Sequence, residues 1–224
     1  MFDRLKAYLK PGVTGIEIFR FVQERIVSLG ASCGWSRYNC PVVTVGPVDY
    51  MGHTPPDERR LEKGWLLQLD LGVRYQGYCS DFQRMFYVLE DGEDGPPEEV
   101  QRLFNLIRKG IDGMIAEIKP GVRNDFPSSV GFAIMTSAGY PEPKYSAGHQ
   151  LGRAVHDGGV GLLDYRHPRP EYRMAAGQVY TVEGLETRLE GRGWVSLEED
   201  VVVTPDGCRV LTDEQRELWL VRER

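Results

Sequence analysis

The spacing of apolar residues near the start of the chain predicts two helices. Leu5 and Leu9 indicate a short helix that ends at a Lys-Pro-Gly sequence. A second helix is expected to begin at Thr14, because Thr14 and Glu17 have the spacing of a capping box. The apolar positions that would share its buried face are Ile18, Phe19, Val22 and Ile26.

Apolar runs and turn residues then predict a β-hairpin with one acid on each arm. Residues 65–70 form an apolar run that leads into Asp70, residues 75–77 supply turn chemistry, and residues 78–88 run back through Asp81. Both acids fall in stretches with the composition of buried strands. An ionised carboxylate is costly in such a place unless a cation meets it, so a metal ion is its natural partner.

The second half of the chain repeats this layout of two helices and an acidic hairpin. Pro96 and Pro97 would open a helix, and a weaker helix is expected over residues 128–137. The apolar stripe of the first of these helices consists of Val100, Leu103, Phe104, Ile107, Ile111, Met114 and Ile118. The hairpin that follows carries Glu183 after one strand and Glu198 within the other. Its strands are expected at residues 178–182 and 194–204, with a turn at residues 191–193.

The tetrapeptide Lys-Pro-Gly-Val occurs at residues 10–13 and again at residues 119–122, each time between two predicted helices. Four matching residues alone could arise by chance, but the matching order of helices and acidic hairpins favours an internal duplication. Halves packed around a pseudo-twofold axis would bring the four acids to one central place. The expected fold class is therefore α+β, with helices covering the outer face of a curved antiparallel sheet.

Composition indicates a soluble globular protein that binds neither nucleic acid nor membranes. The chain has 224 residues, of which 41% are hydrophobic, enough for one large domain or two small ones. Its net charge of −6 argues against a nucleic-acid partner. No apolar stretch approaches the roughly 20 residues that span a bilayer. The four cysteines form no CxxC pair, which favours reduced thiols in a cytoplasmic protein.

The four acids and one histidine, His149, form a ligand set that suits Mn, Co, Zn or Fe. Four negative charges nearly balance two dications, and shared carboxylates can bridge ions about 3.5 to 4 Å apart. The expected cofactors are therefore two divalent metal ions (Mn, Co or Zn), and the expected reaction is amide hydrolysis by a metal-bridging hydroxide. The alternative, a structural ion-pair network, would need more basic partners than Arg74 and Arg84 on the first hairpin.

Four segments resemble, in order, the motifs of the pita-bread metallopeptidases (family M24), the group that contains methionine aminopeptidase, aminopeptidase P and prolidase. They are residues 70–86, 148–157, 181–184 and 198–204. The resemblance implies the creatinase/aminopeptidase fold and a single metallopeptidase catalytic domain over residues 1–224, with pseudo-repeats at about 1–94 and 95–224. The N-terminal domain that Xaa-Pro enzymes generally carry would be absent, in a compact version of the enzyme or in a catalytic fragment.

The resemblance also implies a role for each ligand. Asp70 would bind one metal ion, and Asp81 and Glu198 would bridge both. His149 and Glu183 would complete the other site, and Glu183 also matches the residue taken as the proton shuttle. The implied substrate is a peptide with a free N-terminus.

Two histidines and a tyrosine are the substrate-side candidates that the resemblance implies. His156, seven residues after His149, matches the histidine that contacts the substrate carbonyl or amide. His53 lies where the family has a second substrate-side histidine, and Tyr145 stands where aminopeptidase P and prolidase usually have another. We expect His53, His156 and Tyr145 to contact the peptide, and both histidines to take part in catalysis with Glu183.

The details of the motifs favour a proline-directed enzyme. Residues 77–84, Gly-Tyr-Cys-Ser-Asp-Phe-Gln-Arg, resemble the GYxSDxTR form of Xaa-Pro peptidases. Two other positions depart from the family pattern. Gly184 replaces the proline that normally follows the glutamate, and Ser196, two residues before Glu198, replaces an arginine that these enzymes often have. Glu198 is preferred to Glu199 as the ligand because of its spacing from the Val-Thr pair that follows. The predicted function is a dinuclear metal-dependent aminopeptidase that hydrolyses the N-terminal peptide bond, with preference for Xaa-Pro. The alternatives are methionine aminopeptidase activity, prolidase-type dipeptidase activity and a catalytically inactive peptide-binding module; monomer and homodimer both remain open.

Overall fold

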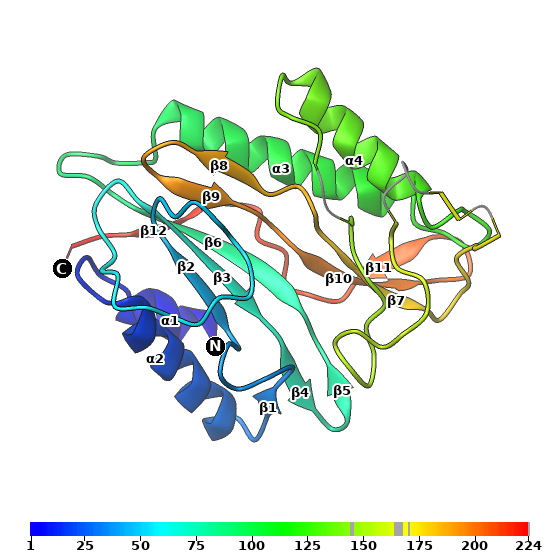
Figure 1. The fold of residues 1–224 in the computed structure, drawn as a ribbon, viewed down its shortest axis with the longest axis horizontal. Helices are drawn as coiled ribbons and strands as arrows, with labels where there is room; N and C mark the ends of the chain where they lie inside the picture. The colour runs from blue at the N-terminus through cyan, green and yellow to red at the C-terminus, as the bar shows by residue number, and fades with distance from the viewer. Residues whose placement is uncertain (144–145, 164–167, 170, 224) are drawn as a thin grey trace.

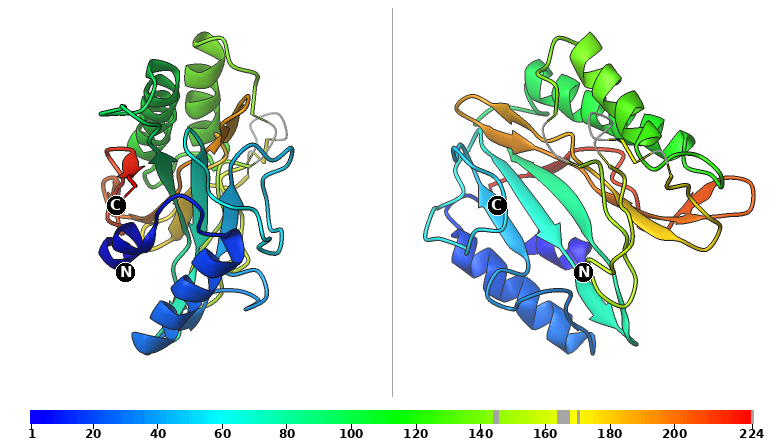
Figure 2. Two further views of the ribbon diagram at one scale, coloured as in Figure 1. Left: turned by 90° about the vertical axis from the view of Figure 1, so that its left-hand side faces the viewer. Right: turned by 45° about the vertical axis from the view of Figure 1, so that its right-hand side comes forward.

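The computed structural model has an α+β fold in which two pairs of helices flank a set of mostly antiparallel strands (Figure 1). It describes residues 1–143, 146–163, 168–169 and 171–223. The helices are α1 (Phe2–Tyr8), α2 (Gly15–Ser28), α3 (Glu98–Ala116) and α4 (Phe126–Ser137). Apolar spacing predicted α1, α2 and α3, the weaker helix expected over residues 128–137 is α4, and the capping box of Thr14 and Glu17 begins α2 as expected. The α1–α2 pair and the α3–α4 pair lie on opposite sides of the strands (Figure 2).

The first half of the chain builds most of a four-stranded sheet in the order β12-β6-β3-β2. Its strands are β2 (Val42–Val45), β3 (Leu66–Leu71), β6 (Phe82–Val88) and β12 (Trp219–Val221). The first three pair antiparallel, whereas β12, from the end of the chain, pairs in parallel with β6. The hairpin continues beyond this sheet as β4 (Val73–Tyr75) and β5 (Tyr78–Cys79), with β1 (Ser32–Cys33) paired to β4. The first predicted acidic hairpin is thus confirmed.

The second half forms two smaller antiparallel sheets. One contains β7 (Val179–Val182), β10 (Glu199–Val203) and β11 (Cys208–Val210), and the other contains β8 (Thr187–Leu189) and β9 (Gly193–Val195). The single strand expected over residues 194–204 was wrong, because the chain leaves the β8–β9 ladder after Val195 and joins the β7–β11 sheet at Glu199. A similar interruption separates β5 from β6 at Asp81. These breaks release Glu198 and Asp81 from the regular alternation of strand side chains.

Alternation of side chains along β3 separates two hydrophobic cores. Leu67 and Leu69 belong to the core that contains Ile18 of α2. Leu66, on the other face, belongs to the core formed with α3 and α4. Asp70 shares the face of Leu66 because residues two or four apart in a strand point the same way. The acid on β3 is therefore directed toward the second half of the molecule.

The two Lys-Pro-Gly-Val segments have the same local structure. Gly12 and Gly121 have φ angles of 89° and 84°, a conformation that glycine adopts without steric cost. The N–H of Gly12 donates to the carbonyl of Leu61 (2.7 Å), and the N–H of Gly121 donates to the carbonyl of Met174 (2.9 Å). In each half the turn ties a helix pair to a later segment, as expected for an internal duplication.

Two expectations drawn from composition can be compared with the structure. Within the described residues, no helix combines the length and the apolar character needed to cross a membrane. The thiols of Cys33, Cys40, Cys79 and Cys208 are all free, as predicted for reduced cysteines.

Candidate metal centre

The five predicted ligands come from both halves of the chain and lie at the ends of strands. Asp70 is the penultimate residue of β3, and Asp81 lies in the interruption before β6. Glu183 directly follows β7, and Glu198 directly precedes β10. His149 lies beside β7, because its backbone is hydrogen-bonded to that strand.

The side chains of these five residues converge. One ligand atom each of Asp81, His149 and Glu198 lie within 4.8 Å of one another. The Nε2 atom of His149 is 3.5 Å from Oδ2 of Asp81 and 3.7 Å from Oε1 of Glu183. Asp70 and Glu183 line one cavity beside these atoms, and the charges of Asp81 and Glu183 act on the carboxyl group of Asp70. The structure thus brings all five predicted ligands to one centre.

Burial and mutual repulsion perturb the protonation of this cluster. Burial, and after it the neighbouring carboxylates, raise the pKa values of Asp70 and Glu198 well above their ordinary range. Burial also raises the pKa of Glu183 to about 7. Burial lowers the pKa of His149, but the bond to Asp81 and the charge of Glu183 outweigh this effect and leave that pKa raised. A cluster of this kind retains protons near neutral pH unless cations replace them.

The donor set of this cluster fits divalent cations. Three buried oxygens have no hydrogen-bond partner among the described residues, namely Asp70 Oδ1, Asp81 Oδ1 and Glu198 Oε1. Buried carboxylate oxygens without a partner cost free energy. Carboxylate oxygens together with an imidazole nitrogen are ligands for hard or borderline divalent metals, so a metal ion would satisfy the atoms that the protein leaves unpaired.

The alternative of a structural ion-pair network does not hold for these acids. Arg84 is bound to Glu199 at 2.8 Å, and Arg108 is bound to the other oxygen of Glu199 at 2.7 Å. The Arg74 side chain donates to a backbone carbonyl. In the part of the chain that the structure describes, no lysine or arginine forms an ion pair with any of the five ligands. The buried arginines therefore pair with Glu199, and the neighbouring Glu198 has no such pair among the described residues.

Sequence analysis missed two residues that hold the ligands in place. The Nε2 atom of Gln83 donates to Oε2 of Glu183 at 3.1 Å. Asp200 accepts the backbone N–H of Asp81 at 3.1 Å, and burial raises its pKa to about 8. Gln83 lies directly opposite Asp70 in the β3–β6 ladder, and this pairing is what brings its side chain to the cluster.

A cavity of about 320 Å³ lies beside the centre, with Asp70, Glu183 and His53 in its walls. The other residues that line it include Tyr50, Met51, Gln83, Ser146 and Glu186. The ring of His53 packs edge-on against Trp35, with ring centroids 5.8 Å apart. This cavity leaves open space directly beside two of the ligands.

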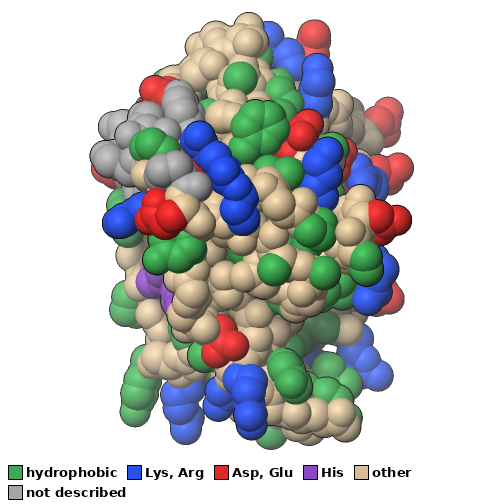
Figure 3. All heavy atoms as spheres, turned by 90° about the vertical axis from the view of Figure 1, so that its right-hand side faces the viewer, with side chains coloured by type: hydrophobic (Ala, Val, Ile, Leu, Met, Phe, Trp, Pro, Cys, Tyr) green, Lys and Arg blue, Asp and Glu red, His purple; other side chains and the backbone are tan. Residues whose placement is uncertain are grey.

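His156 is close to the ligands although it does not line that cavity. Its ring centroid is 4.2 Å from that of His149. Burial and the nearby charge of His149 lower the pKa of His156. Histidine side chains are visible at the molecular surface in Figure 3. The third substrate-side candidate, Tyr145, lies outside the described residues.

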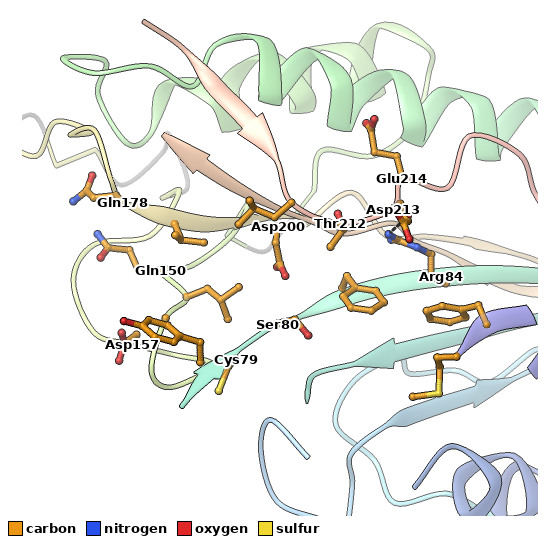
Figure 4. Close-up of a pocket in the computed structure, with 18 of the residues that line it drawn as sticks. Cys79, Ser80, Arg84, Gln150, Asp157, Gln178, Asp200, Thr212, Asp213 and Glu214 are labelled. Carbon is orange, nitrogen blue, oxygen red and sulfur yellow. Dashed lines mark hydrogen bonds between the residues drawn. The ribbon is translucent and has the colours of Figure 1, made fainter. Parts of the chain in front are cut away.

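A larger cavity, of about 990 Å³, lies among the N-terminal residues, β6 and β10 (Figure 4). Phe82, Arg84 and Asp200 are among the residues that line it. None of the five ligands is in its wall, whereas Asp70 and Glu183 line the smaller cavity, so the candidate metal centre adjoins the smaller one. Nothing in the sequence pattern indicated this second space.

The fold and the carboxylate–imidazole cluster define an α+β protein with a candidate metal centre. Residues 1–205 match the model of metallopeptidase family M24, and the chain belongs to this family. An uncharacterized peptidase of Staphylococcus aureus (strain USA300) is 30% identical over 212 residues, covering 94% of this chain and 56% of that protein. The uncharacterized peptidase YqhT of Bacillus subtilis (strain 168) is 27% identical over 223 residues, covering 98% of this chain and 59% of that protein. The chain thus spans little more than half the length of these relatives.

Solved structures confirm the pita-bread fold. The X-Pro aminopeptidase of Thermotoga maritima MSB8 superimposes with a TM-score of 0.85 at 26% identity, covering 98% of this chain and 59% of that one. The Xaa-Pro dipeptidase of Bacillus anthracis gives a TM-score of 0.84 at 26% identity, covering 98% and 58%. The methionine aminopeptidase of Rickettsia prowazekii shares the fold with a TM-score of 0.75 at 20% identity, covering 93% and 90%.

Proposed function

We propose that this chain is the catalytic domain of a dinuclear metal-dependent aminopeptidase that hydrolyses the N-terminal peptide bond, preferentially ahead of proline. The observation that carries the proposal is the convergence of five ligands from both halves, with three buried carboxylate oxygens that lack a partner among the described residues. Membership of a metallopeptidase family supports peptide hydrolysis. Likeness to an X-Pro aminopeptidase and an Xaa-Pro dipeptidase supports the preference for proline.

The proposed cofactors are two divalent ions, Mn, Co or Zn. Asp70 would hold one ion, Asp81 and Glu198 would be shared between both, and His149 with Glu183 would hold the other. When bound, such ions supply a nucleophilic water near neutral pH and positive charge opposite the developing oxyanion. Four carboxylates nearly balance the charge of two dications, which is the reason for proposing two rather than one.

The remaining steps fall to the side chains around the centre. Glu183 would accept the proton released on attack at the peptide carbonyl and return it to the leaving nitrogen. His156, whose lowered pKa favours a neutral ring with one N–H donor, would contact the substrate carbonyl or amide. His53 would contact the peptide from the cavity wall, and Tyr145 is also proposed to contact it. The acids in the cavity wall favour a free N-terminal ammonium group in the substrate.

A peptide-library cleavage assay on metal-stripped protein, with Mn, Co or Zn added in turn, tests activity, specificity and cofactor together. We expect Xaa-Pro-Xaa peptides to lose their first residue, N-acetylated versions to resist cleavage, and elemental analysis to find two ions per chain. Preferential cleavage of Met-Ala-Ser would identify methionine aminopeptidase activity, and cleavage of Xaa-Pro dipeptides alone would identify prolidase activity. Absence of metal together with absence of hydrolysis would overturn the proposal in favour of a catalytically inactive peptide-binding module.

Two further expectations belong to this proposal. A cytoplasmic location is expected because the cysteines are free. Self-association into a homodimer would be measured by sedimentation of the purified chain, and the proposed chemistry holds for either oligomeric state because all five ligands come from one chain.

A further inference from the structure

A series of buried polar side chains leads from β2 to Glu183. The hydroxyl of Thr44 donates to Oε1 of Gln68 at 2.9 Å, and Nε2 of Gln68 donates to Oε1 of Gln83 at 3.3 Å. The hydroxyl of Ser196 donates to the same oxygen of Gln83 at 2.5 Å. The Nε2 atom of Gln83 in turn donates to Oε2 of Glu183 at 3.1 Å.

The two donors on the Gln83 oxygen fix the orientation of its amide group. In this arrangement the oxygen of Gln83 accepts from Gln68 and Ser196, and its NH₂ group meets the carboxylate. The other oxygen of Glu183 is paired with the hydroxyl of Thr181 at 3.3 Å. Each carboxylate oxygen of Glu183 therefore has its own protein donor, and the two donors together favour one orientation at the metal centre.

We propose that Gln83 is a positioning residue that holds the Glu183 carboxylate in the orientation needed for proton transfer. This inference rests on the proposed function of the centre. Gln83 lies directly opposite Asp70 in the β3–β6 ladder, so its backbone is fixed by the hairpin that carries two of the ligands. Its side chain is almost excluded from solvent, so little water competes for the amide donor.

Hydrogen bonds among buried amides and hydroxyls also have a plain structural explanation, in which they only satisfy polar groups within a core. In that case an apolar replacement of similar length at Gln83 changes stability and leaves turnover unchanged. Gln215 provides a matched control, because this buried glutamine bonds both backbone groups of Met85 on the same strand and does not line the metal-centre cavity.

The first experiment compares Gln83→Met with Gln215→Met in metal-loaded protein. Gln83→Met is expected to lower kcat about 10- to 100-fold with KM changed less than about threefold, because misplacing a catalytic group affects the chemical step. Metal content measured by elemental analysis is expected to stay at the wild-type value, because the other four ligands, Asp70, Asp81, His149 and Glu198, keep their positions. Gln215→Met is expected to lower the unfolding midpoint and keep kcat within about twofold of wild type. Wild-type kcat in Gln83→Met, or loss of its metal, overturns the proposal.

The second experiment asks whether Ser196 acts through Gln83. Ser196→Ala alone is expected to lower kcat by less than Gln83→Met does, because Gln68 still holds the amide oxygen. In the Gln83→Met background, Ser196→Ala is expected to have no further effect on kcat. Losses that multiply in the double variant contradict a shared role and overturn the proposal.

Crystal structures of metal-loaded wild type and Gln83→Met separate this inference from the proposed function. We expect the Glu183 carboxylate to leave its wild-type orientation in the variant, while the other ligands keep theirs. An unchanged Glu183 overturns the positioning role even if the wild type cleaves peptides. A wild-type protein that binds metal and cleaves no peptide overturns the proposed function, and it also removes the reason for a proton transfer. The crystallographic comparison still decides in that case whether Gln83 orients Glu183.

Discussion

Three consecutive acids, Glu198, Glu199 and Asp200, have different roles because of their positions around the start of β10. Glu198 precedes the strand and contributes to the ligand cluster, with one buried oxygen that has no partner among the described residues. Glu199, the first residue of the strand, is bound by two buried arginines. Asp200 accepts the backbone N–H of Asp81. Composition treats these acids as equivalent, so only the family motif allowed the sequence to identify Glu198 as the ligand.

Glu199→Gln and Glu198→Gln should therefore have opposite effects on stability. Glu199→Gln should lower the unfolding free energy by about 3 to 5 kcal/mol, because it leaves Arg84 buried without a carboxylate partner and leaves Arg108 with only Asp112 and Glu214. Glu198→Gln should leave the metal-free protein as stable as wild type or more so, since it replaces a buried carboxyl group that has an oxygen without a partner, but should lower metal content. Urea unfolding in EDTA and elemental analysis measure both effects. Equal destabilisation by the two variants would contradict the separate roles.

Glu183 and His156 should be separable from the other residues of the centre by kinetics. Glu183→Gln should lower kcat about 100-fold or more while the protein stays folded, because an amide cannot accept the proton. His156→Ala should lower kcat more than it lowers metal content, since this ring lies beside His149 without being among the expected ligands. Circular dichroism, elemental analysis and steady-state kinetics distinguish these outcomes. Near-normal turnover by Glu183→Gln would show that the proton-shuttle assignment is wrong.

At the scale of the element, the position of His149 depends on close packing between two backbone segments. Gly148 has a φ of 147°, and a Cβ atom at this position would lie 1.9 Å from the carbonyl oxygen of Thr181. The Glu183 N–H bonds to Ala147 on the same segment at 2.9 Å. Two of the five ligands are thus aligned by one backbone pairing that requires glycine at its centre.

Gly148→Ala should accordingly impair the metal centre through the backbone. The methyl group would push the His149 segment away from β7, and an ångström of displacement at a catalytic centre costs about 100-fold in rate. Metal content and the unfolding midpoint should fall as well. Gly95→Ala is the control, because a Cβ at Gly95 meets no atom within 4 Å. Wild-type metal affinity in Gly148→Ala would contradict this dependence on close packing.

Elements with a sustained apolar period could be predicted from the sequence, and interruptions of strands could not. The buried faces of α2 and α3 recur at helical spacing, so both helices were identified along with their buried residues. The break between β9 and β10 was missed because the residues on both sides of it are mostly buried, so no exposed segment marks it. When the chain leaves one strand partner for another, as it does between β9 and β10, the amino-acid composition of the segment gives no sign of the change. Both missed breaks occur at proposed ligands, Asp81 and Glu198. Local sequence rules fail most often at such sites, because the backbone there departs from regular strand geometry.

At the scale of the whole molecule, the ligands join the two halves. Asp70 and Asp81 come from the first half, and His149, Glu183 and Glu198 come from the second. A cation held by both sets would cross-link the halves, so its binding free energy contributes to folding. The repeated order of helices and hairpins predicted this convergence. The 990 Å³ cavity had no such signal, because no motif or repeated pattern marks the residues that line it.

In the metal-free protein the unfolding free energy should depend steeply on pH, and the buried carboxyl groups should make it fall as the pH rises. In the folded protein burial raises the pKa of Glu183 from 4.5 to about 7 and that of Asp200 from 3.8 to about 8. Between these limits the folded chain holds protons that the unfolded chain has released, so the unfolding free energy falls as pH rises from about 4 to about 8. Below that window both states are protonated, and above it both are ionised.

Divalent cations should reverse this loss, because they bind the ionised carboxylates of the folded state. At pH 8, manganese at 100 times its dissociation constant should raise the unfolding free energy by about 2.7 kcal/mol. Urea midpoints measured across pH 4 to 9, in EDTA and in manganese, check the slope and its removal. A flat profile in EDTA would mean that the acids are paired in the metal-free protein. An equal fall in both series would mean that the ion binds elsewhere, because only occupation of this centre replaces the protons that the buried acids hold.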